Sequence, residues 1–214
     1  MVEFFEWVIN MIRNPGELIT WGGYPGLAAI IFLETGALVF FLPGDSLLVM
    51  AGLYAAKGDL NILYLNLLLI PCAIAGDALS YQIGLRAGPH IFNRPKSRFF
   101  DPKHLRTAHD FYEKHGGKAI IIARFMPILR TFVPVVAGVA QMTYRQFAAY
   151  NIIGGASWIL SMTLLGYILG AQFPALGKHV EKVILVVVLL SISPGIYAWI
   201  KMKLAGKPAS DATS

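Results

Sequence analysis

Four charged side chains lie within apolar stretches of this sequence, where charge is rare. They are Glu34, Asp45, Arg124 and Arg130. A carboxyl group can take up and release protons, and the planar guanidinium of arginine matches phosphate oxygens better than the ammonium of lysine does. Together these residue types predict a buried site that binds an anion and exchanges protons.

Structural alternatives are open for each of these four residues. Glu34 could form a structural ion pair or be a protonated, hydrogen-bonded carboxyl group, because a charge at the centre of a membrane helix costs roughly 2.5–3.5 kcal/mol on insertion scales. Asp45 follows a proline and a glycine and could simply cap a helix. The arginines could pair with the two carboxylates as internal stabilising contacts. Both roles are compatible if the arginines bind carboxylates when the site is empty and phosphate when it is loaded.

A second set of residues could support the same site. The members are Gly44, Ser46, Asp77 and Thr131. Gly44 and Ser46 would offer a backbone donor and a hydroxyl donor beside Asp45. Asp77 lies nearer the cytoplasmic end of its apolar segment, where a polar contact with another helix or with the membrane surface would also explain it.

The composition indicates that these residues lie in a membrane. Of 214 residues, 56% are hydrophobic and 14% are charged, whereas soluble domains are roughly 25% charged. Several apolar segments exceed the roughly 18 residues needed to cross hydrocarbon. The formal net charge of +6 is concentrated in a middle loop and at the C-terminus, which indicates membrane orientation rather than nucleic-acid binding. Cys72 is the only cysteine, so an intrachain disulfide is excluded.

The apolar pattern divides one membrane domain, residues 1–214, into successive segments. They are an interfacial N-terminal helix (1–20), a broken segment (26–56), a transmembrane helix (62–85), a basic loop (86–118), a second broken segment (119–142), two transmembrane helices (147–173 and 183–200) and a tail (201–214). The positive-inside rule places the basic loop and the tail in the cytoplasm. A short helix after Asp101 and Pro102 is expected to lie on that membrane surface.

Both broken segments contain prolines and charges where a helix would otherwise continue. Pro43 interrupts the first, and Pro127 and Pro134 interrupt the second. The second arm of the first segment has about 11 residues, or roughly 16 Å, which is too short to cross alone. Two interpretations are open, a re-entrant helical hairpin or a strained span with a loop, and the polar residues at the break favour the hairpin.

Each half of the chain is therefore predicted to form a hairpin followed by a transmembrane helix. The predicted fold class is an all-α integral membrane protein with inverted repeats of this kind, a C-terminal transmembrane helix and short interfacial helices. Paired interrupted segments are typical of transporters with a binding site at the membrane midplane.

Several short motifs carry a resemblance to a known family. They are Glu34–Gly36 (ETG), Phe41–Ser46 (FLPGDS), Gly76–Asp77 (GD), Phe111–Gly117 (FYEKHGG) and Ala123–Phe132 (ARFMPILRTF). With these motifs and this order of spans, the chain resembles the DedA family, whose members carry the VTT, or SNARE-associated, membrane domain.

The resemblance implies a multi-pass protein of the bacterial inner membrane that supports envelope integrity and is linked to the proton motive force. The expected activity is translocation of a phosphate-bearing lipid, undecaprenyl phosphate. The family's acidic pair matches Glu34 and Asp45, which are expected to couple protons. Its arginine pair matches Arg124 and Arg130, which are expected to bind the substrate phosphate.

The expected partners are membrane lipids and protons, with no nucleic acid and no cofactor, and a homo-oligomer is compatible with the sequence. The alternative functions are a proton-coupled small-solute or drug exchanger, a phospholipid scramblase, and a structural or assembly factor. Undecaprenyl phosphate follows from the resemblance alone.

Metal binding and catalysis are not expected. The histidines of the basic loop, His104, His109 and His115, are spaced so that no helix face collects them. Ser97, Arg98 and His104 resemble one motif of membrane lipid phosphatases, but Ala108 stands where that motif has an aspartate. The chain is therefore not expected to be an enzyme.

Overall fold

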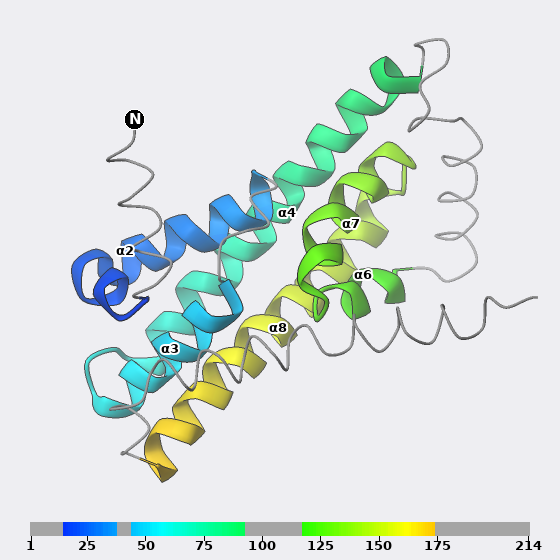
Figure 1. Ribbon diagram of the computed structural model, residues 1–214. Helices are drawn as coiled ribbons and strands as arrows, with labels where there is room; N and C mark the ends of the chain where they lie inside the picture. The colour runs from blue at the N-terminus through cyan, green and yellow to red at the C-terminus, as the bar shows by residue number, and fades with distance from the viewer. Residues whose placement is uncertain (1–14, 38–43, 93–116, 174–214) are drawn as a thin grey trace, which may run out of the picture.

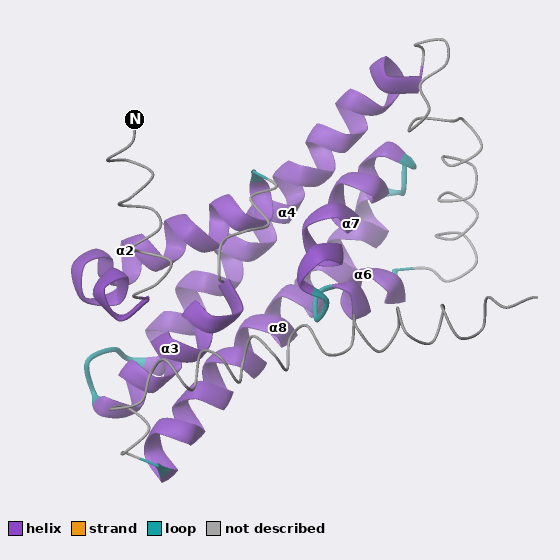
Figure 2. Ribbon diagram, in the orientation of Figure 1, coloured by secondary structure: helices purple, strands orange, loops and turns teal. Residues whose placement is uncertain are grey.

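The computed structural model describes residues 15–37, 44–92 and 117–173, and these residues form helices joined by turns, with no strand among them. Figure 1 shows their order along the chain, and Figure 2 shows the same view by secondary structure. The segments expected at 1–14, 93–116 and 174–214 lie outside the described residues. These include most of the basic loop, the span at 183–200 and the tail.

The first two helices flank the first apolar break in the sequence, whose residues 38–43 lie outside the described residues. Helix α2 spans Pro15–Gly36 and α3 spans Gly44–Lys57. Gly23, with φ 50° and ψ −145°, kinks α2 just before Pro25, and glycine adopts this backbone conformation without the penalty that a side chain brings. Residues 15–20, expected in an interfacial helix, form the beginning of α2. Helix α3 is almost entirely buried.

Two long helices, α4 (Ile62–Phe92) and α8 (Tyr144–Gln172), form the frame of the molecule (Figure 1). Each contains a stretch long and apolar enough to cross a membrane, Ile62–Gly88 and Tyr144–Gln172. Only 33% of the apolar window in each is buried within the chain. Large apolar side chains on both helices are exposed, among them Leu67 of α4 and Ile153 of α8, as lipid-facing residues would be.

The second apolar break divides a shorter pair of helices. Helix α6 covers Lys118–Ala123 and α7 covers Pro127–Val139. Pro127 takes the first helical position of α7, where its missing N–H group removes no intrahelical hydrogen bond. Arg124 therefore lies at the C-terminal cap of α6, and Arg130 lies one turn into α7.

Each long helix packs most extensively against a short helix from the other half of the chain: α8 against α3, and α4 against α7 (Figure 1). Both crossings depend on pairs of glycines. At α3 and α8, a Cβ atom on Gly52 would overlap the carbonyl of Thr163, and one on Gly166 would overlap the carbonyl of Val49.

The crossing of α4 and α7 repeats this pattern. A Cβ atom on Gly84 would overlap the carbonyl of Val135, and one on Gly138 would overlap that of Tyr81. The spacing is the same in both crossings. On each helix, the glycine and the carbonyl that contacts the glycine of the opposite helix are three residues apart, with the glycine second. The backbones can approach this closely only because these positions have no side chain.

Candidate functional site

Arg130 joins the two carboxylates expected to accompany it. Its guanidinium forms ion pairs with Glu34 of α2 through Nη2 and with Asp45 of α3 through Nη1. All three side chains are buried. Residues separated widely in the sequence therefore form one cluster, which we call the Arg130 cluster.

The ends of α2 and α3 place the two carboxylates. Glu34 lies in the last turn of α2, and Asp45 lies in the first turn of α3, where the helix dipole favours a negative charge. The Glu34 carboxylate lies directly against Gly44, so closely that a Cβ atom there would overlap Oε2. Because Gly44 has no side chain, the Glu34 carboxylate can lie against the backbone of α3.

Trp158 of α8 completes the Arg130 cluster. Its indole Nε1 donates a hydrogen bond of 2.9 Å to Asp45 Oδ1. The Arg130 guanidinium carbon lies over the indole ring, 4.7 Å from its centroid, within the range of a cation–π interaction. Four helices, two from each side of the basic loop, thus contribute to this cluster.

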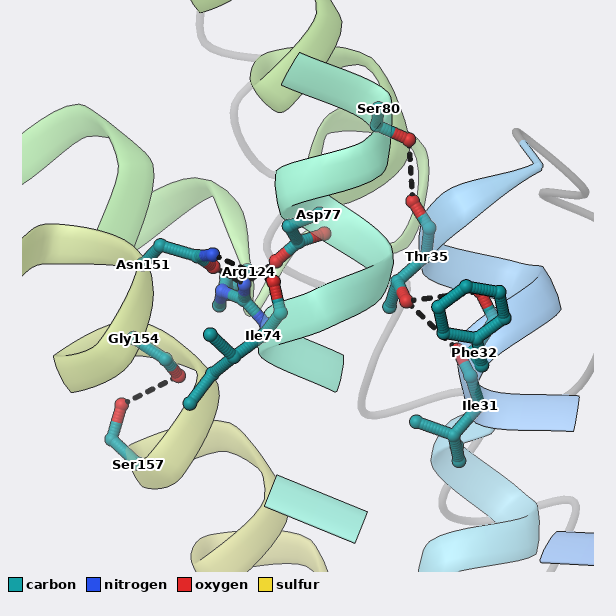
Figure 3. Close-up of polar contacts among 10 residues, drawn as sticks. All are labelled: Ile31, Phe32, Thr35, Ile74, Asp77, Ser80, Arg124, Asn151, Gly154 and Ser157. Carbon is teal, nitrogen blue, oxygen red and sulfur yellow. Dashed lines mark hydrogen bonds and ion pairs between the residues drawn. The ribbon is translucent and has the colours of Figure 1, made fainter. Parts of the chain in front are cut away.

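Arg124 belongs to a separate cluster on the face between α4 and α8, which we call the Arg124 cluster. It forms an ion pair with Asp77 of α4 and donates a hydrogen bond to Asn151 Oδ1 of α8. Asn151 in turn donates from Nδ2 to the carbonyl of Ile74, at 3.0 Å. Figure 3 shows Arg124 between Asp77 and Asn151.

Two glycines of α8 make room for Arg124. A Cβ atom on Gly154 would lie 3.0 Å from Arg124 Cδ, and one on Gly155 would lie 3.3 Å from Nη1. Both distances are shorter than ordinary van der Waals contact. The arginine side chain therefore lies flat across this part of α8.

Helix α4 also holds the end of α2. The Ser80 hydroxyl lies 2.7 Å from the carbonyl oxygen of Thr35 (Figure 3). The carbonyl oxygen of Gly36 is a second, more distant acceptor at 3.2 Å. The last carbonyls of a helix have no partner within the helix, and the single hydroxyl proton of Ser80 serves this pair, with the shorter distance to Thr35. This contact fixes the turn of α2 that carries Glu34.

The structure thus divides the two arginines between two clusters rather than joining them in one ion-pair network. Asp77, a secondary candidate from the sequence, is the carboxylate partner of Arg124. Ser46 and Thr131 are buried close in sequence to Asp45 and Arg130, and Gly44 contacts Glu34.

Sequence reasoning missed Trp158 and Asn151. Trp158 is fully buried and donates a hydrogen bond to Asp45. The available signal for Asn151 was a polar amide within an apolar span.

The two clusters carry an excess of negative charge if every group is ionised. Three carboxylates, of Glu34, Asp45 and Asp77, face two guanidiniums. Among the residues that the structure describes, Glu34 Oε2 and Arg130 Nε find no hydrogen-bond partner although both are buried. Within the described part of the chain, no group of three or more His, Cys, Asp and Glu residues is arranged to hold a metal ion. The arrangement is suited to exchanging protons and anions.

The chain is similar in sequence to several known membrane proteins. Residues 42–168 match the VTT domain. The chain is 45% identical over 211 residues to Protein DedA of Escherichia coli (strain K12), which covers 96% of each chain. It is 42% identical over 174 residues to an uncharacterized membrane protein of Mycobacterium leprae (strain TN), covering 81% of this chain and 78% of that protein.

A further relative is the inner membrane protein YqjA of Escherichia coli (strain K12), 35% identical over 167 residues, which cover 78% of this chain and 76% of YqjA. No solved structure matches the chain. The matches span most of this chain and most of each relative. The chain is a membrane protein that belongs to the DedA family and carries its VTT domain.

Proposed function

We propose that this protein is a transporter that translocates a phosphate-bearing lipid, undecaprenyl phosphate, across the bacterial inner membrane and is coupled to the proton motive force. The observation that carries the proposal is the Arg130 cluster, in which a buried guanidinium is shared by the carboxylates of Glu34 and Asp45. A carboxylate and a phosphate bind the same donors of a guanidinium. Arg130 can therefore exchange one for the other.

Proton coupling follows from the charges that such an exchange leaves behind. A phosphate that binds Arg130 displaces Glu34 or Asp45 from it. A buried carboxylate without a cation is costly, so the displaced group must find another partner or take up a proton. Binding of the anion and uptake of a proton are then linked, and release reverses both.

The proposal assigns Arg124 a different task from Arg130. Arg124 is matched by one carboxylate and one amide, and it lies at the start of the break before α7. We assign Arg124 to the same translocation route: the phosphate of the lipid contacts Arg124 in one step and Arg130 in another. The side chains of both clusters bind anions and protons and carry out no bond cleavage.

An inverted repeat is the architecture we propose for this transporter. The two crossings, α3 with α8 and α4 with α7, use glycines at the same spacing. The other contacts correspond as well, since α2 packs on α4 as α6 packs on α8. These equivalences support two hairpins, α2 with α3 and α6 with α7, each followed by a long helix. The hairpins would enter from opposite sides, with the C-terminus in the cytoplasm.

Binding by the purified protein tests the proposal. The wild-type protein should bind undecaprenyl phosphate more tightly than undecaprenol, which has the same lipid chain without phosphate, and more tightly than inorganic phosphate. The Arg130→Lys variant keeps the charge but loses the planar fork. Its affinity should fall about ten- to hundred-fold, because a hydrogen bond to a charged group is worth roughly 1.5–3 kcal/mol.

Arg145→Lys is the matched control, because Arg145 is an exposed arginine near the start of α8. Its affinity for the lipid should equal that of the wild type. Equal affinity for undecaprenol and undecaprenyl phosphate would refute the lipid-phosphate site. Preference for inorganic phosphate would favour a small-anion exchanger, and reduced thermal stability with unchanged affinity in Arg130→Lys would leave Arg130 a structural residue.

A further inference from the structure

Trp158 lies at the centre of the Arg130 cluster although it carries no charge. It contacts both members of one ion pair: the indole N–H donates to Asp45 Oδ1, which also accepts from Arg130 Nη1, and the indole ring lies beneath the guanidinium of Arg130. The side chain is 0% exposed. A side chain that only filled the core would need neither the hydrogen bond to Asp45 nor the contact with the Arg130 guanidinium.

The two contacts support the ion pair in different ways. An indole N–H group can only donate a hydrogen bond, so it holds an anionic oxygen. The ring face attracts the guanidinium through its quadrupole, and this attraction occupies none of the N–H donors of Arg130. A polar side chain in the same place would compete with carboxylate or phosphate for those donors. Trp158 supports the guanidinium and leaves its donors available.

We propose that Trp158 is a positioning residue of the anion site, holding Arg130 by its ring and presenting its N–H group to whichever anion Arg130 binds. This inference rests on the proposed function, since it deepens the account of the same site. When a phosphate replaces Asp45 on Arg130, the indole N–H exchanges a carboxylate oxygen for a phosphate oxygen. The surroundings of the indole therefore change when the lipid binds.

Two substitutions separate the contacts of Trp158. Trp158→Phe keeps an aromatic face and removes the N–H donor, whereas Trp158→Leu removes both. The dissociation constant for undecaprenyl phosphate should rise about tenfold in Trp158→Phe, as expected for one lost hydrogen bond to a charged group, and further in Trp158→Leu. The measurement is lipid binding to the purified protein, with melting temperature recorded alongside.

Phe147→Leu is the matched control. Phe147 is also fully buried on α8 and stacks on Tyr81, with 4.5 Å between ring centroids, in a separate part of the core. This variant should lower the melting temperature and leave the lipid affinity unchanged. It measures the loss of thermal stability when α8 loses a buried aromatic ring that lies outside the anion site.

Fluorescence provides a readout that does not depend on a variant at this position. Replacing Trp7, Trp21 and Trp199 with phenylalanine leaves Trp158 as the only tryptophan. Its emission should shift on titration with undecaprenyl phosphate and stay constant with undecaprenol. If the ring only fills the core, its emission should stay constant with both lipids.

The outcomes of these experiments are distinguishable. If the wild-type protein binds undecaprenyl phosphate, while both Trp158 variants bind it as tightly as Phe147→Leu does and the emission of Trp158 stays constant, the inference is overturned and the proposed function stands. If the wild-type protein binds no lipid phosphate, the proposed function fails, and the inference with it. Weaker binding in the Trp158 variants together with shifted emission supports both.

Discussion

Arg124 and Arg130 have the same side chain but are held by different partners. Arg130 is shared by two carboxylates and an indole ring, whereas Arg124 has one carboxylate and one amide. A buried ion pair is sensitive to the loss of either member, because the remaining charge has no compensation. The partners therefore predict which variants will destabilise the fold and which substitutions will compensate one another.

Arg124 and Asp77 should behave as a coupled pair. Arg124→Ala and Asp77→Ala are each expected to lower the free energy of unfolding by about 3–5 kcal/mol, because each leaves an uncompensated buried charge. The double variant should be clearly less destabilised than the sum of the two. The measurement is the unfolding free energy of the four proteins in one detergent.

A second double variant provides the control for this cycle. Glu34 pairs with Arg130 and not with Arg124, so Arg124→Ala and Glu34→Ala should show a smaller coupling energy than Arg124→Ala and Asp77→Ala. A coupling with Glu34 as large as that with Asp77 would contradict the division into two clusters.

The identity of the charged residues was predictable from the sequence, but their pairing was not. A charge within an apolar segment is visible in the sequence because it is costly there. Which carboxylate faces which arginine depends on how α4 packs on α7 and α8. Trp158 and Asn151 were missed for the same reason, because their importance comes from partners on other helices.

At the level of helices, the site depends on two close crossings between short and long helices. Helix α3 carries Asp45 and packs on α8, which carries Trp158. Helix α7 carries Arg130 and packs on α4. The glycines of these crossings set how near the helices approach, and therefore the distances within the Arg130 cluster.

Enlarging a crossing glycine should disturb both stability and binding. A Cβ atom on Gly52 would overlap the backbone of Thr163, so Gly52→Ala must separate α3 from α8. Overpacking of this kind costs about 1–3 kcal/mol. Gly52→Ala should lower the melting temperature and weaken lipid binding, because Asp45 and Trp158 move apart.

Gly26→Ala is the matched control for Gly52→Ala. It lies within α2, and a Cβ atom there would meet nothing within 4 Å. This substitution should leave binding unchanged and be neutral or slightly stabilising, because alanine favours a helix more than glycine does. Equal behaviour of the two variants would show that the crossing tolerates a side chain.

Of the predicted helix breaks, the one at Pro127 is confirmed, Pro134 lies inside α7 instead of interrupting it, and Pro43 lies outside the described residues. Pro127 marks the start of α7 directly, because proline suits the first helical position. The end of α4 was expected at Leu85, before Arg86, but the helix continues to Phe92. A long arginine side chain can extend toward the membrane surface, so a charge does not by itself end a helix. The kink at Gly23 depends on a backbone angle that the sequence does not specify.

At the level of the whole molecule, an apolar exterior surrounds a charged interior. Both long helices expose large apolar side chains, while the carboxylates and guanidiniums of both clusters are buried where the two halves of the chain meet. A protein that exposes apolar side chains and buries charges is suited to a lipid environment, in which charged residues face the protein interior.

The orientation of the molecule can be tested by cysteine labelling. The positive-inside rule places Ser97 and Ser210, which lie outside the described residues, in the cytoplasm. In a Cys72→Ser background, cysteines at these two positions should resist a membrane-impermeant thiol reagent in intact cells and react after permeabilisation. Ready labelling of either position in intact cells would overturn the topology.

Translocation of undecaprenyl phosphate in proteoliposomes with an imposed pH gradient tests the central claim most directly. Wild-type protein should translocate the lipid faster with the gradient than without it, and should not act on undecaprenol. Glu34→Gln removes one of the two carboxylates of the Arg130 cluster that can take up a proton, so its translocation should respond less to the gradient than that of the wild type. A wild-type rate that ignores both the gradient and the phosphate group, or a Glu34→Gln variant that responds to the gradient as the wild type does, would contradict the account.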